Sequence, residues 1–113
     1  MSYQIIPSPD FERVFKRLLK RHKSLKKDMA VLGESLKTNP KQGDSLKNSW
    51  YKVRLAISSK NKGKSGGARV ITYVLVLKER VILLDIYDKS DHDTISEKEL
   101  EQLINNIPDE LLE

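Results

Sequence analysis

Five side chains in the second half of the chain have types suited to acting on a phosphodiester: Lys52, Arg54, Arg69, Tyr87 and Lys89. An arginine fork binds phosphate through two parallel hydrogen bonds. A lysine or tyrosine can carry a proton when neighbouring cations lower its pKa. Such a group could orient the attack of an RNA 2′-hydroxyl on the adjacent phosphorus and stabilise the added charge without a metal ion. Each residue alone is more simply a solvent-facing strand residue, so the hypothesis depends on their convergence.

Three predicted strands would bring these residues together. Residues 50–58 alternate apolar with basic or small side chains, which is typical of a half-buried strand with Lys52 and Arg54 on one face. Residues 69–77 are β-forming and apolar on both faces after Arg69, which predicts a central strand. Residues 80–88 predict a last strand that pairs with it through a turn at Lys78-Glu79.

The last strand decides whether the five side chains share a surface. Simple alternation places Ile82, Leu84 and Ile86 on the core face. The opposite face then carries Leu83, Asp85, Tyr87 and Lys89. If Arg69 lies on this open face, the sheet presents a basic surface with a phenol in it, which suits a phosphate backbone flanked by stacked bases.

Helices are predicted before and after these strands. Residues 2–6 form a short strand ended by Pro7, and Pro9 opens a helix whose apolar residues repeat at helical spacing (Phe11, Val14, Phe15, Leu18, Leu19). Ser24 is the expected N-cap of a second helix that ends at Asn39-Pro40, and residues 41–49 are expected to be a polar loop. Ser96 and Glu99 have the spacing of a capping box for a C-terminal helix with an apolar stripe (Leu100, Leu103, Ile104, Ile107).

The predicted order is β-α-α-β-β-β-α in one domain, residues 1–113. The first two helices could form a hairpin or one bent rod, and the predicted fold takes the hairpin. This is an α+β domain: a mostly antiparallel four-stranded sheet with an N-terminal helical hairpin and a C-terminal helix, the helices lying on one face.

The charge distribution favours a polyanionic partner. The net charge is +5, but residues 1–89 carry +12 and residues 90–113 carry −7. The basic part fits nucleic acid, whereas the acidic end could cover that surface, face solvent or meet a basic partner. No cysteine, no long apolar run and no signal-like N-terminus are present, so we expect a cytoplasmic protein without a membrane partner.

Other candidate residues give weaker signals. His22 lies in a segment rich in lysine and arginine and is expected to be exposed, while His92 lies in a predicted turn at residues 91–94. Two isolated histidines do not predict a metal site, and we expect no metal and no small-molecule cofactor. Gly63-Lys64-Ser65 resembles the end of a phosphate-binding P-loop, but a strand follows where a helix is needed, so we reject nucleotide hydrolysis. Trp50 could stack on a base, although core packing is the simpler interpretation.

Several motifs in one order resemble a known family. Asn39-Pro40 precedes Gly43 and Leu46, and a strand that begins Trp50-Tyr51-Lys52-Val53-Arg54-Leu55 follows. Next come Gly66-Gly67-Ala68-Arg69-Val70-Ile71 and then Tyr87-Asp88-Lys89. In this order and spacing the chain resembles the RelE/ParE superfamily of toxins, in its RelE/HigB-like branch, over nearly its whole length.

The resemblance implies a type II toxin of a toxin–antitoxin system that cleaves mRNA on the ribosome and is inhibited by a cognate antitoxin. It implies a site at Lys52, Arg54 and Arg69, with Lys89 as a further basic residue and Tyr87 as a candidate tyrosine. Two alternatives stay open. One is a ParE-like poison of DNA gyrase, and the other is a non-enzymatic member of the fold that binds RNA or only its antitoxin.

Overall fold

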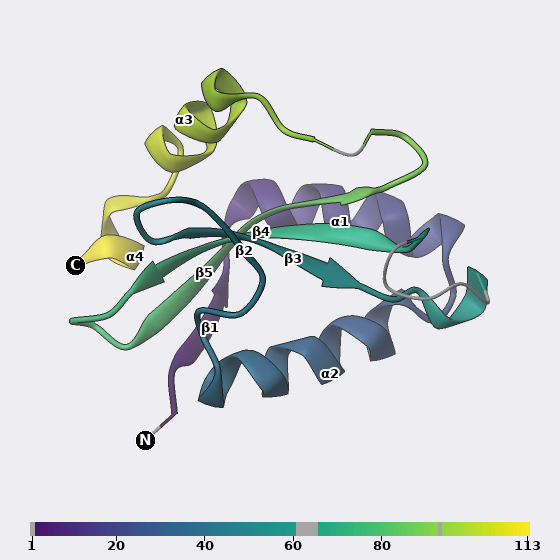
Figure 1. Cartoon of the computed structure of the whole chain (residues 1–113), viewed down its shortest axis with the longest axis horizontal. Coiled ribbons are helices and arrows are strands. Elements are labelled where there is room, and N and C mark those ends of the chain that lie inside the picture. The colour runs from purple at the N-terminus through teal and green to yellow at the C-terminus, as the bar shows by residue number, and fades with distance from the viewer. Residues whose placement is uncertain (1, 61–65, 93) are drawn as a thin grey trace.

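The sheet contains one strand more than the sequence predicted. The computed structural model describes residues 2–60, 66–92 and 94–113 (Figure 1). Within these residues, five strands form one sheet in the order β1-β5-β4-β3-β2. Their bounds are β1 Gln4–Pro7, β2 Asp44–Lys47, β3 Trp50–Leu55, β4 Ala68–Leu75 and β5 Arg80–Asp88. β1 runs parallel to β5 and the other pairings are antiparallel, so the sheet is mixed, and the four-stranded prediction was wrong.

The additional strand, β2, lies in the segment 41–49 that was expected to be a polar loop. It pairs with β3 through Asp44 opposite Lys52 and Ser45 opposite Tyr51, with an irregularity before Lys47. β2 is the last strand of the sheet and has one neighbour, so its other side faces solvent and polar residues are tolerated there. Its sequence therefore lacks the apolar alternation by which a strand is normally recognised.

The predicted helical hairpin is present and covers one face of the sheet. Helix α1 (Pro9–Arg21) begins at Ser8, whose Oγ accepts the Phe11 N–H at 3.1 Å, and helix α2 (Leu25–Thr38) follows after residues 22–24. The predicted apolar stripes face the sheet. They form one core with β3, β4 and β5 that includes Phe11, Leu18, Leu25, Leu36, Val53, Val70 and Leu83.

The C-terminal segment covers the other face, so the prediction that all helices lie on one face was wrong. Helix α3 (Glu97–Asn105) begins with the predicted capping box of Ser96 and Glu99. Helix α4 (Asp109–Leu112) is separate from α3. Proline disfavours a helical backbone in the residue that precedes it, and Pro108 follows Ile107 between the two helices. The second core contains Ile71, Ile82, Leu84, Tyr87, Leu100 and Ile107. In Figure 1 the sheet lies between α2 and α3.

A bulge in β5 changes which of its residues share a face. Ile71 of β4 lies opposite Asp85 and Thr72 lies opposite Leu83, so β5 carries one extra residue at this point. Ile82 and Leu84 belong to the core under the C-terminal segment, whereas Ile86 belongs to the core under the helical hairpin. The predicted common face of these three residues was wrong for Ile86, because alternation holds only where the strand is regular.

The β4–β5 connection is longer than the predicted Lys78-Glu79 turn. β4 ends at Leu75, and Val76 and Leu77 are exposed in the turn. Glu79 has a positive φ of 53° and donates its N–H to the Val76 carbonyl at 3.1 Å. No helix within the described residues is long and apolar enough to cross a membrane.

Candidate functional site

Three of the five predicted site residues lie in one row across the sheet. Arg54 of β3 is directly opposite Arg69 of β4, which is directly opposite Tyr87 of β5. Directly opposed residues share a face, with Cβ atoms about 5 Å apart. Tyr87 belongs to the core under the C-terminal segment, while Ala68, beside Arg69, belongs to the core under the helical hairpin. The row therefore lies on the face that α3 and α4 cover.

The two lysines flank this row. Lys52 precedes Arg54 by two residues, lies opposite Ile71 and is half-buried. Lys89 follows the end of β5, where its backbone N–H donates to the Gly67 carbonyl at 3.0 Å. The predicted residues thus converge at one end of β3, β4 and β5.

The surface that they form is not the open face that the sequence suggested. Arg69 is only 2% exposed and Tyr87 only 5% exposed. The Arg69 guanidinium donates a hydrogen bond to the Ala68 carbonyl at 3.1 Å, and Tyr87 packs in the core that contains Leu100 and Ile107. Arg54 is exposed. For Tyr87 the difference arises because the C-terminal segment packs on the same face of the sheet.

His92 lies beside the row, although the sequence predicted only that it is part of a turn. Its ring stacks on the Tyr87 ring with centroids 4.1 Å apart and an angle of 24° between the planes. The turn after β5 makes this contact possible, because the His92 and Asp91 N–H groups both donate to the Asp88 carbonyl. A histidine five residues after the strand tyrosine, within a predicted turn, was the available signal.

A cavity of about 420 Å³ lies beside this aromatic pair, between α1 and the end of β5. Its walls include Arg17, Arg21, Asp85, Tyr87 and His92. Burial raises the pKa of the Asp85 carboxyl, against the opposing effects of the Ile86 N–H and of His92. An acid with a raised pKa, an imidazole and two guanidinium groups therefore meet next to the row.

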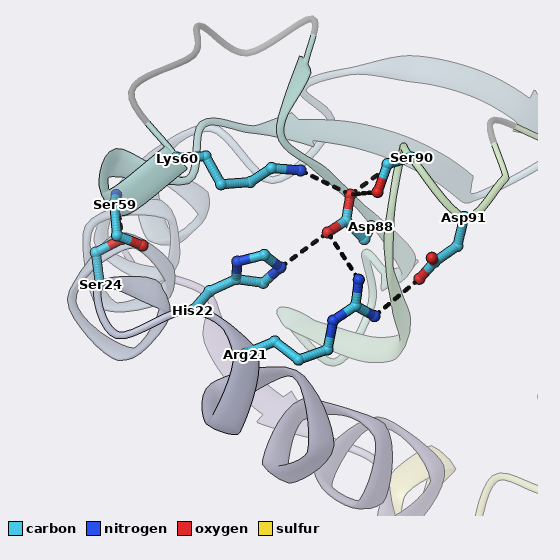
Figure 2. A network of polar contacts seen from close by, with 8 residues as sticks. All are labelled: Arg21, His22, Ser24, Ser59, Lys60, Asp88, Ser90 and Asp91. Carbon is cyan, nitrogen blue, oxygen red and sulfur yellow. Dashed lines mark hydrogen bonds and ion pairs between the residues drawn. The ribbon is translucent and has the colours of Figure 1, made fainter.

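Asp88 is the centre of a separate polar network on the helical-hairpin side (Figure 2). Its buried carboxylate is 2.8 Å from His22 Nε2 and 2.9 Å from Lys60 Nζ, and it accepts the Ser90 N–H and Oγ–H at 2.9 and 2.7 Å. Arg21 lies 3.6 Å away and also pairs with Asp91 at 3.1 Å. Although burial alone would raise it, the pKa of Asp88 is held far below its usual range by hydrogen bonds from Ser90, Lys60 and His22.

The expectation that His22 is exposed was wrong. His22 is the C-cap of α1 and is 9% exposed, with its ring directed to Asp88. The neighbouring lysines and arginines face solvent, but the helix ends at His22 and the chain turns inward there. Because His22 and Asp88 are 66 residues apart, local composition could not reveal the contact.

Comparison with known proteins identifies the architecture. No family model matches the sequence. Among solved structures, the chain is similar to a mutant of the Escherichia coli toxin RelE with two arginines replaced by alanine, in the free state. The TM-score is 0.58 over 95% of each chain, at 13% sequence identity. The chain has a RelE-like fold.

The RelE-like fold agrees with the resemblance seen in the sequence motifs, and at this identity it shows the fold alone. No group of three or more histidine, cysteine, aspartate or glutamate side chains within the described residues could hold a metal ion. Gly63-Lys64-Ser65, considered as a P-loop remnant, lies outside the described residues. The candidate site of this RelE-like fold is thus the row Arg54–Arg69–Tyr87 with Lys52, Lys89 and His92 beside it.

Proposed function

We propose that this chain is the toxin of a type II toxin–antitoxin system and that it cleaves mRNA on the ribosome in the cytoplasm. The observation that carries the proposal is the row of Arg54, Arg69 and Tyr87 with His92 stacked on Tyr87. This places phosphate-binding groups next to groups that can move protons. The RelE-like fold supports the toxin assignment.

The cleavage is an internal transfer within the RNA. The 2′-oxygen bonds to phosphorus and its proton leaves, while the bond to the 5′-oxygen breaks and that oxygen takes up a proton. The products are a 2′,3′-cyclic phosphate and a 5′-hydroxyl. In this proposal Arg54, which is exposed, binds the non-bridging oxygens, and His92 gives the proton to the leaving oxygen. Arg69 lies beneath them and adds positive potential, while Tyr87 positions the imidazole by stacking.

The partners follow from the same arrangement. The ribosome would supply the mRNA and help to orient the 2′-oxygen, as this set of groups provides few means to do so. An antitoxin that carries acidic side chains across the basic row would block access to Arg54. The antitoxin, the ribosome and mRNA are therefore the proposed partners, with no cofactor.

A second candidate function is favoured by the burial of Arg69 and Tyr87. With these side chains covered, the chain could bind RNA or an antitoxin without cleaving RNA. Cleavage activity separates the two candidates directly.

The test is a reconstituted translation reaction on a defined mRNA, with cuts mapped by primer extension. Arg54→Ala and His92→Ala suit this test because both side chains are exposed and their loss leaves the cores intact. Each should lower the cleavage rate by about 100-fold or more. Lys98→Ala, on the exposed side of α3, is the matched control and should cleave like wild type.

Cuts that require ribosomes and both residues would support the proposed site. Normal cutting by Arg54→Ala and His92→Ala would place the chemistry elsewhere. If wild type makes no cuts but inhibits DNA supercoiling by gyrase, the ParE-like alternative replaces the proposal. If it does neither and still binds RNA, the non-enzymatic candidate holds.

A further inference from the structure

The helical hairpin carries the densest positive charge in the chain. Residues 13–27 contain eight lysines and arginines and no aspartate or glutamate. The segment covers most of α1, the connection and the first turn of α2. It lies over the sheet face opposite to the row Arg54–Arg69–Tyr87, and only Arg17 and Arg21 reach the cavity beside Tyr87, so the proposed cleavage site does not account for its other cations.

Six of these cations are exposed and form no ion pair with the described residues. Of the eight, Arg13 pairs with Asp10 and Arg21 pairs with Asp88 and Asp91. The other six, which we call the hairpin cations, are Lys16, Arg17, Lys20, Lys23, Lys26 and Lys27.

The placement of these cations opposes helix stability. Arg13, Lys16, Arg17 and Lys20 follow helical spacing and share one face of α1, away from its apolar stripe. Like charges three and four residues apart destabilise a helix by a few tenths of a kcal/mol for each pair. Lys26 and Lys27 lie in the first turn of α2, where the helix dipole disfavours positive charge. An external polyanion would offset these costs.

We propose that the hairpin cations bind the sugar–phosphate backbone of a nucleic-acid duplex, which on the ribosome is ribosomal RNA. The ribosomal source rests on the proposed function, whereas duplex binding itself does not. The part of α1 from Arg13 to Lys20, which contains three of the hairpin cations, spans about 10 Å along the helix axis. A B-form duplex presents about six phosphate charges over that length. The chain would thus hold a structured RNA with one face and offer the other to mRNA.

A phosphate backbone fits this surface better than an acidic protein does. Protein interfaces have an apolar centre with aromatic anchors and are depleted in lysine. The apolar residues of α1 are instead turned to the sheet. Val31, Val76 and Leu77, the large hydrophobic residues exposed within the described part of the chain, all lie outside residues 13–27. Long, exposed cations without apolar neighbours suit backbone contacts that do not depend on sequence.

The test measures binding of the full chain to a fluorescent 20-base-pair RNA duplex between 50 and 200 mM salt. The hairpin variant carries Lys16→Gln, Lys20→Gln and Lys26→Gln. The matched control carries Lys41→Gln, Lys78→Gln and Lys98→Gln, which removes the same charge from exposed positions elsewhere. Glutamine keeps good helix propensity, and equal melting temperatures verify that both variants fold.

The hairpin variant should bind at least about tenfold more weakly at 100 mM salt, with a shallower dependence of log affinity on log salt. The control variant should stay within about twofold of wild type. Equal weakening in both variants would reduce the effect to net charge and overturn the proposal. Unchanged duplex affinity in the hairpin variant would also overturn the proposal. The same holds if the hairpin variant keeps its duplex affinity and instead loses affinity for an acidic antitoxin.

Two further arms identify the source and separate this proposal from the proposed function. A DNA duplex of the same sequence tests the shared backbone chemistry, and we expect it to show the same ranking of variants. Sedimentation with ribosomes tests the ribosomal source, and the hairpin variant should be recovered less than the control. If wild type cleaves no mRNA, the proposed function is wrong. The duplex measurements still decide whether the hairpin cations bind a nucleic-acid backbone.

Discussion

Two carboxylates three residues apart on β5 have opposite surroundings. Asp88 is buried and receives hydrogen bonds from His22, Lys60 and Ser90, and its pKa is lowered. Asp85 is half-buried at the bulge and accepts the Ile86 N–H, and no ion pair links it to another described residue. Its pKa is raised, with burial as the main cause.

The comparison shows that the partners of a carboxylate decide whether its burial stabilises the fold. Through its contacts with His22 and Lys60, Asp88 links the end of β5 to the end of α1 and to the 3₁₀ turn Ser58–Lys60. Asp85 instead keeps a costly charge beside the cavity that His92 and Tyr87 line. A folded domain tolerates such a cost where the group serves a site. We therefore expect Asp88 to matter for stability and Asp85 for function.

The largest expected effect is that of Asp88→Asn. Its loss leaves Lys60 and Arg21 without this counter-charge and the buried His22 ring without its carboxylate partner, so the free energy of unfolding should fall by about 3 kcal/mol or more. Urea denaturation followed by circular dichroism measures this. Asp91→Asn is the matched control, since its side chain is 49% exposed, and it should cost under about 1 kcal/mol. Equal losses in the two variants would contradict the central role of Asp88.

Acid should remove the same stabilisation. Because the pKa of Asp88 is lower in the folded than in the unfolded chain, its contribution is complete above the unfolded value of about 3.9 and is lost as the pH falls below it. The stability difference between wild type and Asp88→Asn should therefore narrow progressively below about pH 4. A constant difference from pH 7 to pH 2 would show that shape, and not charge, carries the effect.

The next effect concerns His22 and Asp88 together. His22→Gln should lower the free energy of unfolding by about 2 kcal/mol, since a buried hydrogen-bonded ring is lost. In the double variant with Asp88→Asn the loss should be smaller than the sum, by about 1 kcal/mol, because the two side chains interact directly. Additive losses in a double-mutant cycle would mean that the 2.8 Å contact contributes nothing.

The smallest effect, and of opposite sign, is expected for Asp85→Asn. Asparagine keeps the acceptor for the Ile86 N–H and removes the charge, so the fold should gain up to about 0.5 kcal/mol at pH 7. The pKa of Asp85 is higher in the folded than in the unfolded chain. The free energy of unfolding of wild type therefore decreases as the pH rises above about 4 and Asp85 ionises, whereas that of the variant does not. The stability difference between Asp85→Asn and wild type should vanish near pH 3. If Asp85→Asn is less stable than wild type at pH 7, the charge of Asp85 stabilises the fold as that of Asp88 does, and the proposed contrast between the two carboxylates is wrong.

Local patterns in the sequence were sufficient for the elements with strong periodicity. The α1 stripe from Phe11 to Leu19, the capping box at Ser96 and the bounds of β5 were predicted correctly. In each case, neighbouring residues contain the whole signal. A common surface for Arg54, Arg69 and Tyr87 was predicted only on the condition that Arg69 lies on the same face, and the strand register places the three residues in one row.

The errors have a common physical origin in contacts between distant residues. β2 exists because it pairs with β3, although its own sequence is polar. The burial of Arg69 and Tyr87 arises from the tertiary structure around the sheet, which the sequence of a strand does not encode. The bulge before Ile86 and the contact of His22 with Asp88 also arise from tertiary packing. The packing of the C-terminal segment places Tyr87 on a covered face of the sheet and not on the predicted open face.

The parallel pairing of β1 with β5 has a consequence for the timing of synthesis. Gln4 lies opposite Arg80 and Pro7 lies opposite Leu83, so the first strand has no partner in the sheet until the last strand has been made. At about 5–20 residues per second, that interval is roughly 4–15 seconds. Since the last strand also carries Tyr87 and Asp88, a nascent chain has neither a closed sheet nor a complete candidate site.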